Sequence, residues 1–199
     1  HEKRFQTDSC PVNTAMVYSI CVKPDGIIDG NRKGKKETGM NIEEYDLKIP
    51  EGCNIILGHA HFIKTVDDLY EAMVSSSTSV KFGIGFSEAS QERLVRVDGN
   101  DDELQRLAAD AIMGIGCGHT FIIYMKDAFP INFLGAIKAV PEICRIICAT
   151  ANPLKVLIAR TEQGGGIMGV IDGAAPAGIE GAEHVQIRRK FLRDIGYKR

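Results

Sequence analysis

Two histidines follow a short apolar segment, and their type and spacing give this sequence its clearest opportunity for chemistry. Only Ala60 separates His59 from His61, so both imidazoles lie on one face if the chain is extended there. An imidazole titrates near neutral pH and can act as a nucleophile toward a phosphoryl group. Two rings can also begin a zinc site, which needs further ligands. The alternative is that neither histidine has a chemical role, with one packed and hydrogen-bonded and the other exposed.

The segment His61–Thr65 favours anion binding. It leads from the end of an expected strand to the start of an expected helix. Thr65–Asp68 has the pattern of a capping box, in which the threonine hydroxyl accepts a hydrogen bond from the Asp68 amide. Free N–H groups and the helix dipole attract anions at such a start, and Lys64 adds a positive charge. We therefore expect a phosphate bound at this turn to meet His61.

Other candidate ligand-binding groups lie at expected strand ends and turns, where binding residues usually gather. Three successive glycines, residues 164–166, let backbone amides line an anion or let a ligand ring approach closely, but a plain hairpin turn explains them equally well. Carboxylates in such places can hold Mg²⁺ or the hydroxyls of a ribose. Asn152 and Asp172 are also common turn formers. The polar candidates are Glu88, Asp127, Asn132, Asn152, Glu162 and Asp172.

Several common binding motifs are excluded. Gly114, Gly116 and Gly118 follow an expected helix and precede an expected strand, which is the reverse of the order in a dinucleotide-binding fingerprint. The sequence contains no GxxxxGK[ST] phosphate-binding loop. Its six cysteines fit neither a zinc-binding pattern nor a secreted disulfide framework, which favours a reducing cytoplasm.

Helices and strands alternate along the chain, and strands then cluster toward its end. This order is typical of an α/β domain, and we expect a single-domain, layered α/β sandwich with a mixed sheet over residues 40–199. Residues 1–39, which include a glycine-rich basic stretch, are expected to form a partly flexible N-terminal extension. The expected helices begin near residue 65, at a cap over 100–103, at Pro130 and near residue 183, and the expected strands cover 53–58, 80–86, 93–97, 120–125, 143–148, 156–159 and 167–171.

Composition narrows the possible partners. Of the 199 residues, 44% are hydrophobic, which is enough for a substantial core. The 24 basic and 26 acidic residues argue against a nucleic-acid partner, because such a protein needs a basic excess. No apolar run is long enough to span a bilayer, so we expect no membrane partner. Glycine-rich edges on an apolar domain favour a homo-oligomer.

Short blocks spread along the chain resemble those of a known family. They include His61–Thr65 (HFIKT), Gly118–Phe121 (GHTF), Lys126–Asn132 (KDAFPIN), Cys148–Pro153 (CATANP) and Gly169–Gly173 (GVIDG). In this order, over about residues 41–199, the sequence resembles the adenosine-specific kinase family of archaea and bacteria. So many separate blocks do not arise from a shared fold alone.

The resemblance implies a cytoplasmic α/β protein that binds adenosine and AMP and transfers a phosphoryl group through a phosphohistidine. It implies His61 as that histidine, His119 as the second candidate, and Lys64 and Asp127 as further catalytic residues. Mg²⁺ would accompany the phosphate donor, and no tightly bound cofactor or metal centre is expected. The substrate-binding residues that it implies are Glu88, Asn132, Asn152, Glu162, Gly164 and Asp172.

The sequence also departs from the family pattern at three places. Residues 1–39 have no counterpart, Gln91-Glu92 replaces a frequent Gly-Pro turn, and Gly165 stands where a basic side chain is expected. The main alternative function is a nucleoside-binding or sensing protein without turnover. A metal hydrolase that uses His59 and His61 is a further alternative.

Overall fold

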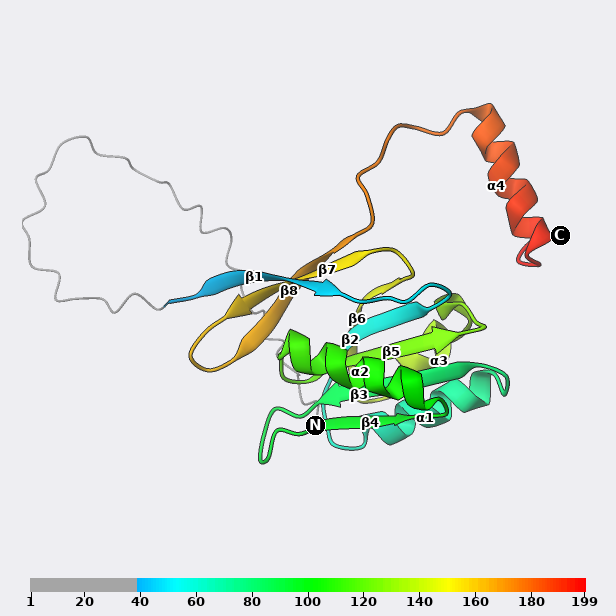
Figure 1. Cartoon of the computed structure of the whole chain (residues 1–199). Coiled ribbons are helices and arrows are strands. Elements are labelled where there is room, and N and C mark those ends of the chain that lie inside the picture. Colours follow the sequence, from blue (N-terminus) through cyan, green and yellow to red (C-terminus); the bar gives the residue numbers. More distant parts are fainter. Residues whose placement is uncertain (1–38) are drawn as a thin grey trace, which may run out of the picture. The chain divides into compact units, whose positions relative to one another are not determined.

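The computed structural model describes residues 39–199, so the expected extension over residues 1–39 lies outside the described part except for Gly39. Within this range the chain forms two β-sheets and four α-helices (Figure 1). The helices are α1 (Thr65–Ser76), α2 (Asp102–Ile115), α3 (Leu134–Ala139), which follows a short 3₁₀ turn (Pro130–Asn132), and α4 (Ala182–Asp194). The strands are β1 (Asn41–Leu47), β2 (Asn54–Ala60), β3 (Lys81–Ser87), β4 (Val95–Gly99), β5 (Thr120–Lys126), β6 (Ile143–Thr150), β7 (Leu154–Arg160) and β8 (Gly165–Asp172).

The expected layered α/β architecture is confirmed, and its strands form two sheets in which every neighbouring pair is antiparallel. The larger sheet has the order β4-β3-β5-β2-β6, and the smaller has the order β1-β7-β8. The sequence pattern predicted parallel neighbours as well. They do not occur in these sheets because α1 links β2 to β3, and α2 links β4 to β5, across one intervening antiparallel strand.

The larger sheet is buried on both faces because other elements pack against each of them, and successive side chains of a strand point to opposite faces. Ile55 and Leu57 of β2 pack with α2 and with strand β7 of the smaller sheet. Ile56, between them, packs with α1 and α3. Figure 1 shows α2 and α1 on opposite sides of this sheet. The larger sheet is therefore the middle one of three layers.

Two glycines explain how closely α2 packs on β3. A Cβ at Gly83 would collide with the backbone of Leu104 and Gln105, and a Cβ at Gly85 would lie 2.7 Å from the Ala108 carbonyl oxygen. Neither position tolerates a side chain unless the helix shifts. The alternation of glycine with large apolar residues in β3 thus fixes the height of α2 above the sheet, and with it the place where α2 ends.

Helix α4 differs from the other helices because none of its residues is buried. Ile187 and Phe191, which lie one helical turn apart, are 59% and 58% exposed. Its C-terminal end is held by the Tyr197 hydroxyl, which donates to Asn132 Oδ1 at 3.0 Å.

Among residues 39–199, no helix has the length and hydrophobicity that a bilayer crossing requires.

Candidate functional site

Two neighbouring cavities open where strand β3 ends. Their volumes are about 830 and 380 Å³. Glu88, Glu92 and Arg93 line both cavities, and all three belong to the β3–β4 loop, residues 88–94. One loop therefore presents two carboxylates and a guanidinium to both spaces.

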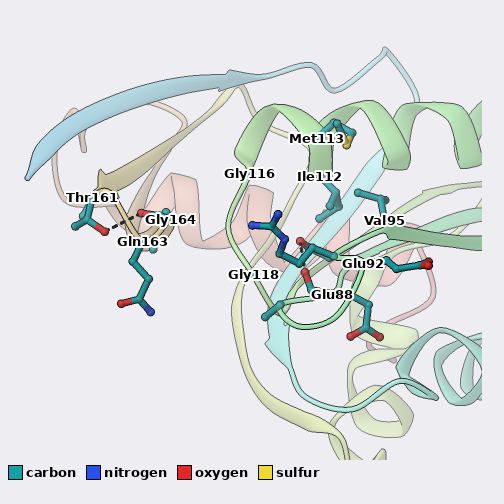
Figure 2. Close-up of a pocket in the computed structure, with 16 residues that line it drawn as sticks. Glu88, Glu92, Val95, Ile112, Met113, Gly116, Gly118, Thr161, Gln163 and Gly164 are labelled. Atoms are coloured by element: carbon teal, nitrogen blue, oxygen red, sulfur yellow. Dashed lines mark hydrogen bonds between the residues drawn. The ribbon is translucent and has the colours of Figure 1, made fainter.

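Three segments that are distant in sequence line the larger cavity. Ile112 and Met113 come from the last turns of α2, and Thr161 and Gly164 come from the β7–β8 turn, across the cavity from Glu88 (Figure 2). Within the turn, the Thr161 hydroxyl donates to the Gly164 carbonyl at 3.2 Å. The cavity thus has an apolar side, made by the helix, and a polar side, made by the two loops.

A backbone bridge and a side-chain hydrogen bond hold the β7–β8 turn against the end of α2. Cys117 and Gly165 form an isolated parallel bridge, and Arg160 Nη1 donates to the Gly116 carbonyl at 3.0 Å. A Cβ at Gly165 would collide with the Arg160 guanidinium. The basic side chain expected at position 165 is absent, and a guanidinium from the neighbouring strand lies beside that position. Arg160 Nε also pairs with Glu43 at 2.9 Å, so its charge is already balanced.

The smaller cavity contains the titratable and basic groups that phosphate chemistry needs. His61 and His119 line it together with Arg93 and Arg96. Arginine is the side chain best shaped to hold a phosphate through two parallel hydrogen bonds. The remaining lining residues are Phe62, Ile63, Glu88, Ser90, Gln91, Glu92 and Leu94.

Backbone strain is concentrated around this smaller cavity. Within residues 39–199, five non-glycine residues have positive φ angles, and four of them line the cavity: Phe62 (86°), Gln91 (53°), Arg93 (53°) and His119 (58°). Such a conformation costs about 1–3 kcal/mol per residue and clusters at functional sites. This concentration of strain marks the cavity independently of its side-chain chemistry.

The three histidines near the cavity have different surroundings. His119 stacks parallel to Phe86 with ring centroids 6.1 Å apart, and His59 meets His119 edge-on at 6.1 Å. Burial, then the charges of Arg145 and His119, lowers the pKa of His59. His59 lines neither cavity, whereas His61 is exposed and lines the smaller one. Across residues 39–199, no three His, Cys, Asp or Glu side chains are grouped closely enough to hold a metal ion.

Lys64 belongs to the segment His61–Thr65, and two carboxylates share its positive charge. Its Nζ is 2.6 Å from Asp68 Oδ2 and 2.7 Å from Glu142 Oε1. These two hydrogen bonds, first that of Asp68 and then that of Glu142, raise the pKa of Lys64. Lys64 is the N-cap residue of α1 and does not line either cavity. The structure therefore gives this lysine a role in holding its own turn.

Glu142, which no sequence pattern singled out, is the most buried charged residue among those described. Only 4% of it is exposed, and its Oε2 atom has no hydrogen-bond partner within residues 39–199. Its backbone carbonyl accepts from the His61 amide at 2.9 Å. The available sequence signal was a glutamate between Pro141 and the apolar start of β6, where a buried position is expected.

Three further predicted site residues lie near the cavities. Glu88 lines both of them, and its Oε1 accepts from Arg96 Nε at 2.9 Å. Gly164 lines the larger cavity with φ at +155°, a conformation that a side chain would strain. Glu162 belongs to the same turn and is exposed, but it is not among the lining residues.

The other predicted residues lie at the opposite end of the strands. In the larger sheet His59 pairs with Thr120, whereas Asn54 pairs with Met125, so Asp127 follows the end of β5 that is remote from His61. In the smaller sheet β7 begins with Leu154, which pairs with Asp172, and it reaches the larger cavity only at its last residues, from Ala159 on. The structure therefore does not bring these residues to either cavity: Asp127, Asn132, Asn152 and Asp172.

Two of these residues have a structural task. Asp172 Oδ1 accepts from the Thr150 hydroxyl at 2.7 Å and from Asn152 Nδ2 at 3.0 Å. These bonds close the β6–β7 turn onto the end of β8. They agree with the turn-forming role that was the alternative for Asn152 and Asp172.

Arg93 and Arg96 were also missed as site residues. The segment Arg93–Val97 was identified as a strand partner of β3, and β4 does pair with β3 from Val95 to Gly99. Period-two alternation places side chains on a face of a sheet, but it does not reveal which residues of the strand or of its loop face a cavity. The departure at Gln91-Glu92 was the nearest signal, since Gln91 takes the positive φ there.

Comparisons with known proteins show the family to which this chain belongs. The family model described as adenosine specific kinase matches residues 45–198. The chain belongs to the adenosine-specific kinase family. A solved structure, the PH1918 protein from Pyrococcus horikoshii OT3, is 43% identical, with a TM-score of 0.77 over 80% of this chain and 99% of that one. No curated protein gives a significant match. The match to this adenosine-specific kinase family covers both cavities and both histidines that line the smaller one.

Proposed function

We propose that this protein binds adenosine and AMP and transfers a phosphoryl group through His61. One observation carries the proposal: two histidines and two arginines line a cavity that shares Glu88, Glu92 and Arg93 with a larger, partly apolar cavity. Membership of the adenosine-specific kinase family supports adenosine as the substrate.

The nucleoside occupies the larger cavity in this proposal. A volume of about 830 Å³ lies within the range of roughly 300–1,000 Å³ that is usual for small-molecule sites. Ile112 and Met113 offer an apolar surface to the base, and the glycines of the β7–β8 turn let a flat ring come close to the backbone. Glu88 provides a carboxylate that can accept hydrogen bonds from the ribose hydroxyls.

The phosphoryl group occupies the smaller cavity, where Arg93 and Arg96 neutralise its charge. Phosphoryl transfer depends mainly on positioning and charge stabilisation. Arg96 already pairs with Glu88, so a bound phosphate and Glu88 share this guanidinium. Lys64 contributes less than the sequence implied, because Asp68 and Glu142 already balance its charge.

The proposed reaction has two displacement steps. In the first, the lone pair of a neutral His61 ring nitrogen attacks the terminal phosphorus of a nucleoside triphosphate, supplied as its Mg²⁺ complex. The N–P bond forms, the bridging P–O bond breaks, and the nucleoside diphosphate leaves with the electron pair. In the second, the 5′-hydroxyl oxygen of adenosine attacks the phosphorus, the N–P electron pair returns to the imidazole, and the hydroxyl proton passes to His119.

Replacement of the proposed nucleophile tests this function. His61→Asn should lose all ³²P label from γ-labelled ATP, GTP, CTP and UTP and should form no AMP, while its adenosine Kd by calorimetry stays within threefold of wild type. His184→Asn, on α4, is the matched control and should label normally. In the wild type the label should be acid-labile, with the intact mass falling by one HPO₃.

The outcomes separate the two functions. Label retained in His61→Asn excludes His61 as the nucleophile. If wild-type protein binds adenosine but neither takes label nor forms AMP with any of the four triphosphates, it is a nucleoside-binding protein without turnover.

We also propose that the protein self-associates with a second copy of itself and works in a reducing compartment such as the cytoplasm. Exposed apolar side chains on α4 and on the outer face of the smaller sheet, among them Ile42 and Met168, support self-association. The cysteines of the described part, Cys53, Cys117, Cys144 and Cys148, are unpaired, which supports a reducing compartment. Burial and then Asp172 raise the pKa of Cys148 to about 11, so this thiol stays protonated.

A further inference from the structure

We infer that Glu142 is a positioning residue that holds the His61–Thr65 turn in the shape that places His61 at the smaller cavity. The catalytic meaning of this inference rests on the proposed function, because it takes His61 as the nucleophile. The positioning itself concerns only the fold of the turn, and it can be tested without any phosphate donor.

Glu142 is attached to both ends of the turn. Its backbone carbonyl accepts from the His61 amide at 2.9 Å, at the point where β2 ends. Its carboxylate Oε1 lies 2.7 Å from Lys64 Nζ, at the start of α1. Glu142, in the turn that directly precedes β6, thus contacts both ends of residues 61 to 64.

The bracketed turn contains a strained residue. Phe62 has a φ of +86°, which is rare for a residue with a large side chain. Such a conformation persists only where surrounding contacts over-determine it. Inside the turn, Thr65 donates to the Phe62 carbonyl twice, from its hydroxyl at 2.7 Å and from its amide at 3.3 Å. Glu142 supplies the contacts from outside, so it accounts for the persistence of the strained shape.

The two carboxylates on Lys64 are not equivalent. The Asp68 side chain is 29% exposed and lies one helical turn away on the same helix, an arrangement that contributes little to stability. The Glu142 side chain is only 5% exposed, and its second oxygen has no partner among residues 39–199. A buried carboxylate with one ion-pair partner depends strongly on that partner. We therefore assign the holding of the turn to the Glu142–Lys64 pair, and only a small contribution to the Asp68–Lys64 pair.

The experiment compares Glu142→Gln with Asp68→Asn as the matched control, since each removes one carboxylate charge from Lys64. We expect Glu142→Gln to lower the yield of acid-labile label at His61 at least tenfold while its adenosine Kd stays within threefold of wild type. Asp68→Asn should keep both values within twofold. A loss of label with unchanged nucleoside affinity is expected because Glu142 acts on the turn and lines neither cavity.

A second readout measures the position of His61 directly. The rate of diethyl pyrocarbonate modification at His61, normalised to that at His184 on α4 and located by peptide mass, should change at least threefold in Glu142→Gln and remain at the wild-type value in Asp68→Asn. A glutamate that only stabilises the fold would lower Tm without moving this ratio. If Glu142→Gln does not fold, Lys64→Met, at an exposed position, removes the Glu142 pair together with the Asp68 pair. Because Asp68→Asn reports the loss of the Asp68 pair alone, Lys64→Met should show the change expected of Glu142→Gln.

These readouts keep the two proposals apart. A folded Glu142→Gln protein with wild-type His61 reactivity overturns the positioning role, whatever the label shows. If the wild type takes no label, phosphoryl transfer fails, and the reactivity ratio alone decides whether Glu142 positions His61.

Discussion

The positive charge of the smaller cavity is divided unevenly between two arginines. Arg96 is held by Glu88, whereas Arg93 has no carboxylate within ion-pairing distance among residues 39–199. Arg93 also lines both cavities from a strained backbone position. The loop holds Arg93 in a strained conformation, and this places an unpaired guanidinium at both cavities. Such an arrangement is suited to bind an anion that lies between the two cavities.

Arg93→Gln should therefore weaken AMP binding much more than adenosine binding. A hydrogen bond to a charged group contributes about 1.5–3 kcal/mol, so we expect the AMP Kd to rise about tenfold or more. The adenosine Kd should stay within twofold. Calorimetry with both ligands measures this, and Arg106→Gln, an exposed change on α2, is the control. Equal weakening of both ligands would show that Arg93 acts on the nucleoside or on the fold of the loop.

The sequence predicted those site residues that their own short segments reveal, and it missed those that depend on contacts between distant segments. His61, Glu88 and Gly164 stand in short segments whose residue types already indicate ligand chemistry, and the structure places them on a cavity. Glu142 and Arg93 depend on which distant segment lies beside them, and a local pattern holds no information about that. Asp127 looked equivalent to Glu88 because the register of β5 is needed to tell one end of the sheet from the other.

Among the elements, the packing of α2 on β3 places the apolar side of the larger cavity. Gly83→Ala should destabilise the protein by about 1–3 kcal/mol, because its Cβ would collide with the backbone of α2. Urea unfolding measures the change. Gly135→Ala in α3 is the control: its Cβ meets no atom within 4 Å, so stability should stay constant or rise by up to about 1 kcal/mol. A Gly83→Ala protein as stable as wild type would contradict this account of the helix position.

Apolar periodicity predicted most elements but not the strand β1, and the capping box expected at the start of α1 is wrong. The alternation in β1 is interrupted by acids, and the strand is held by ion pairs with β7, from Lys155 to Glu44 at 2.8 Å and from Arg160 to Glu43 at 2.9 Å. The expected capping box has Thr65 as an acceptor. In the structure Thr65 lies inside the helix, where its hydroxyl donates to Phe62, because the turn at Phe62 leaves that carbonyl within reach.

For the whole molecule, helix α4 is the clearest test of self-association. A helix that keeps Ile187 and Phe191 exposed gains stability when a second copy covers them. The double variant Ile187→Glu/Phe191→Glu should reduce the mass in sedimentation equilibrium to that of one chain and leave adenosine binding unchanged. Gln186→Glu, on another face of the helix, should keep the wild-type mass. A wild-type protein that sediments as one chain would refute the self-association proposal.

The loop common to the two cavities has a thermodynamic consequence. Because Glu88, Glu92 and Arg93 border both spaces, a molecule in one space changes the charge and the freedom of the groups that the other presents. Any such coupling is reciprocal: the factor by which a phosphate donor alters nucleoside affinity equals the factor by which the nucleoside alters donor affinity. Titration of either molecule in the presence of the other would therefore give the same linkage energy.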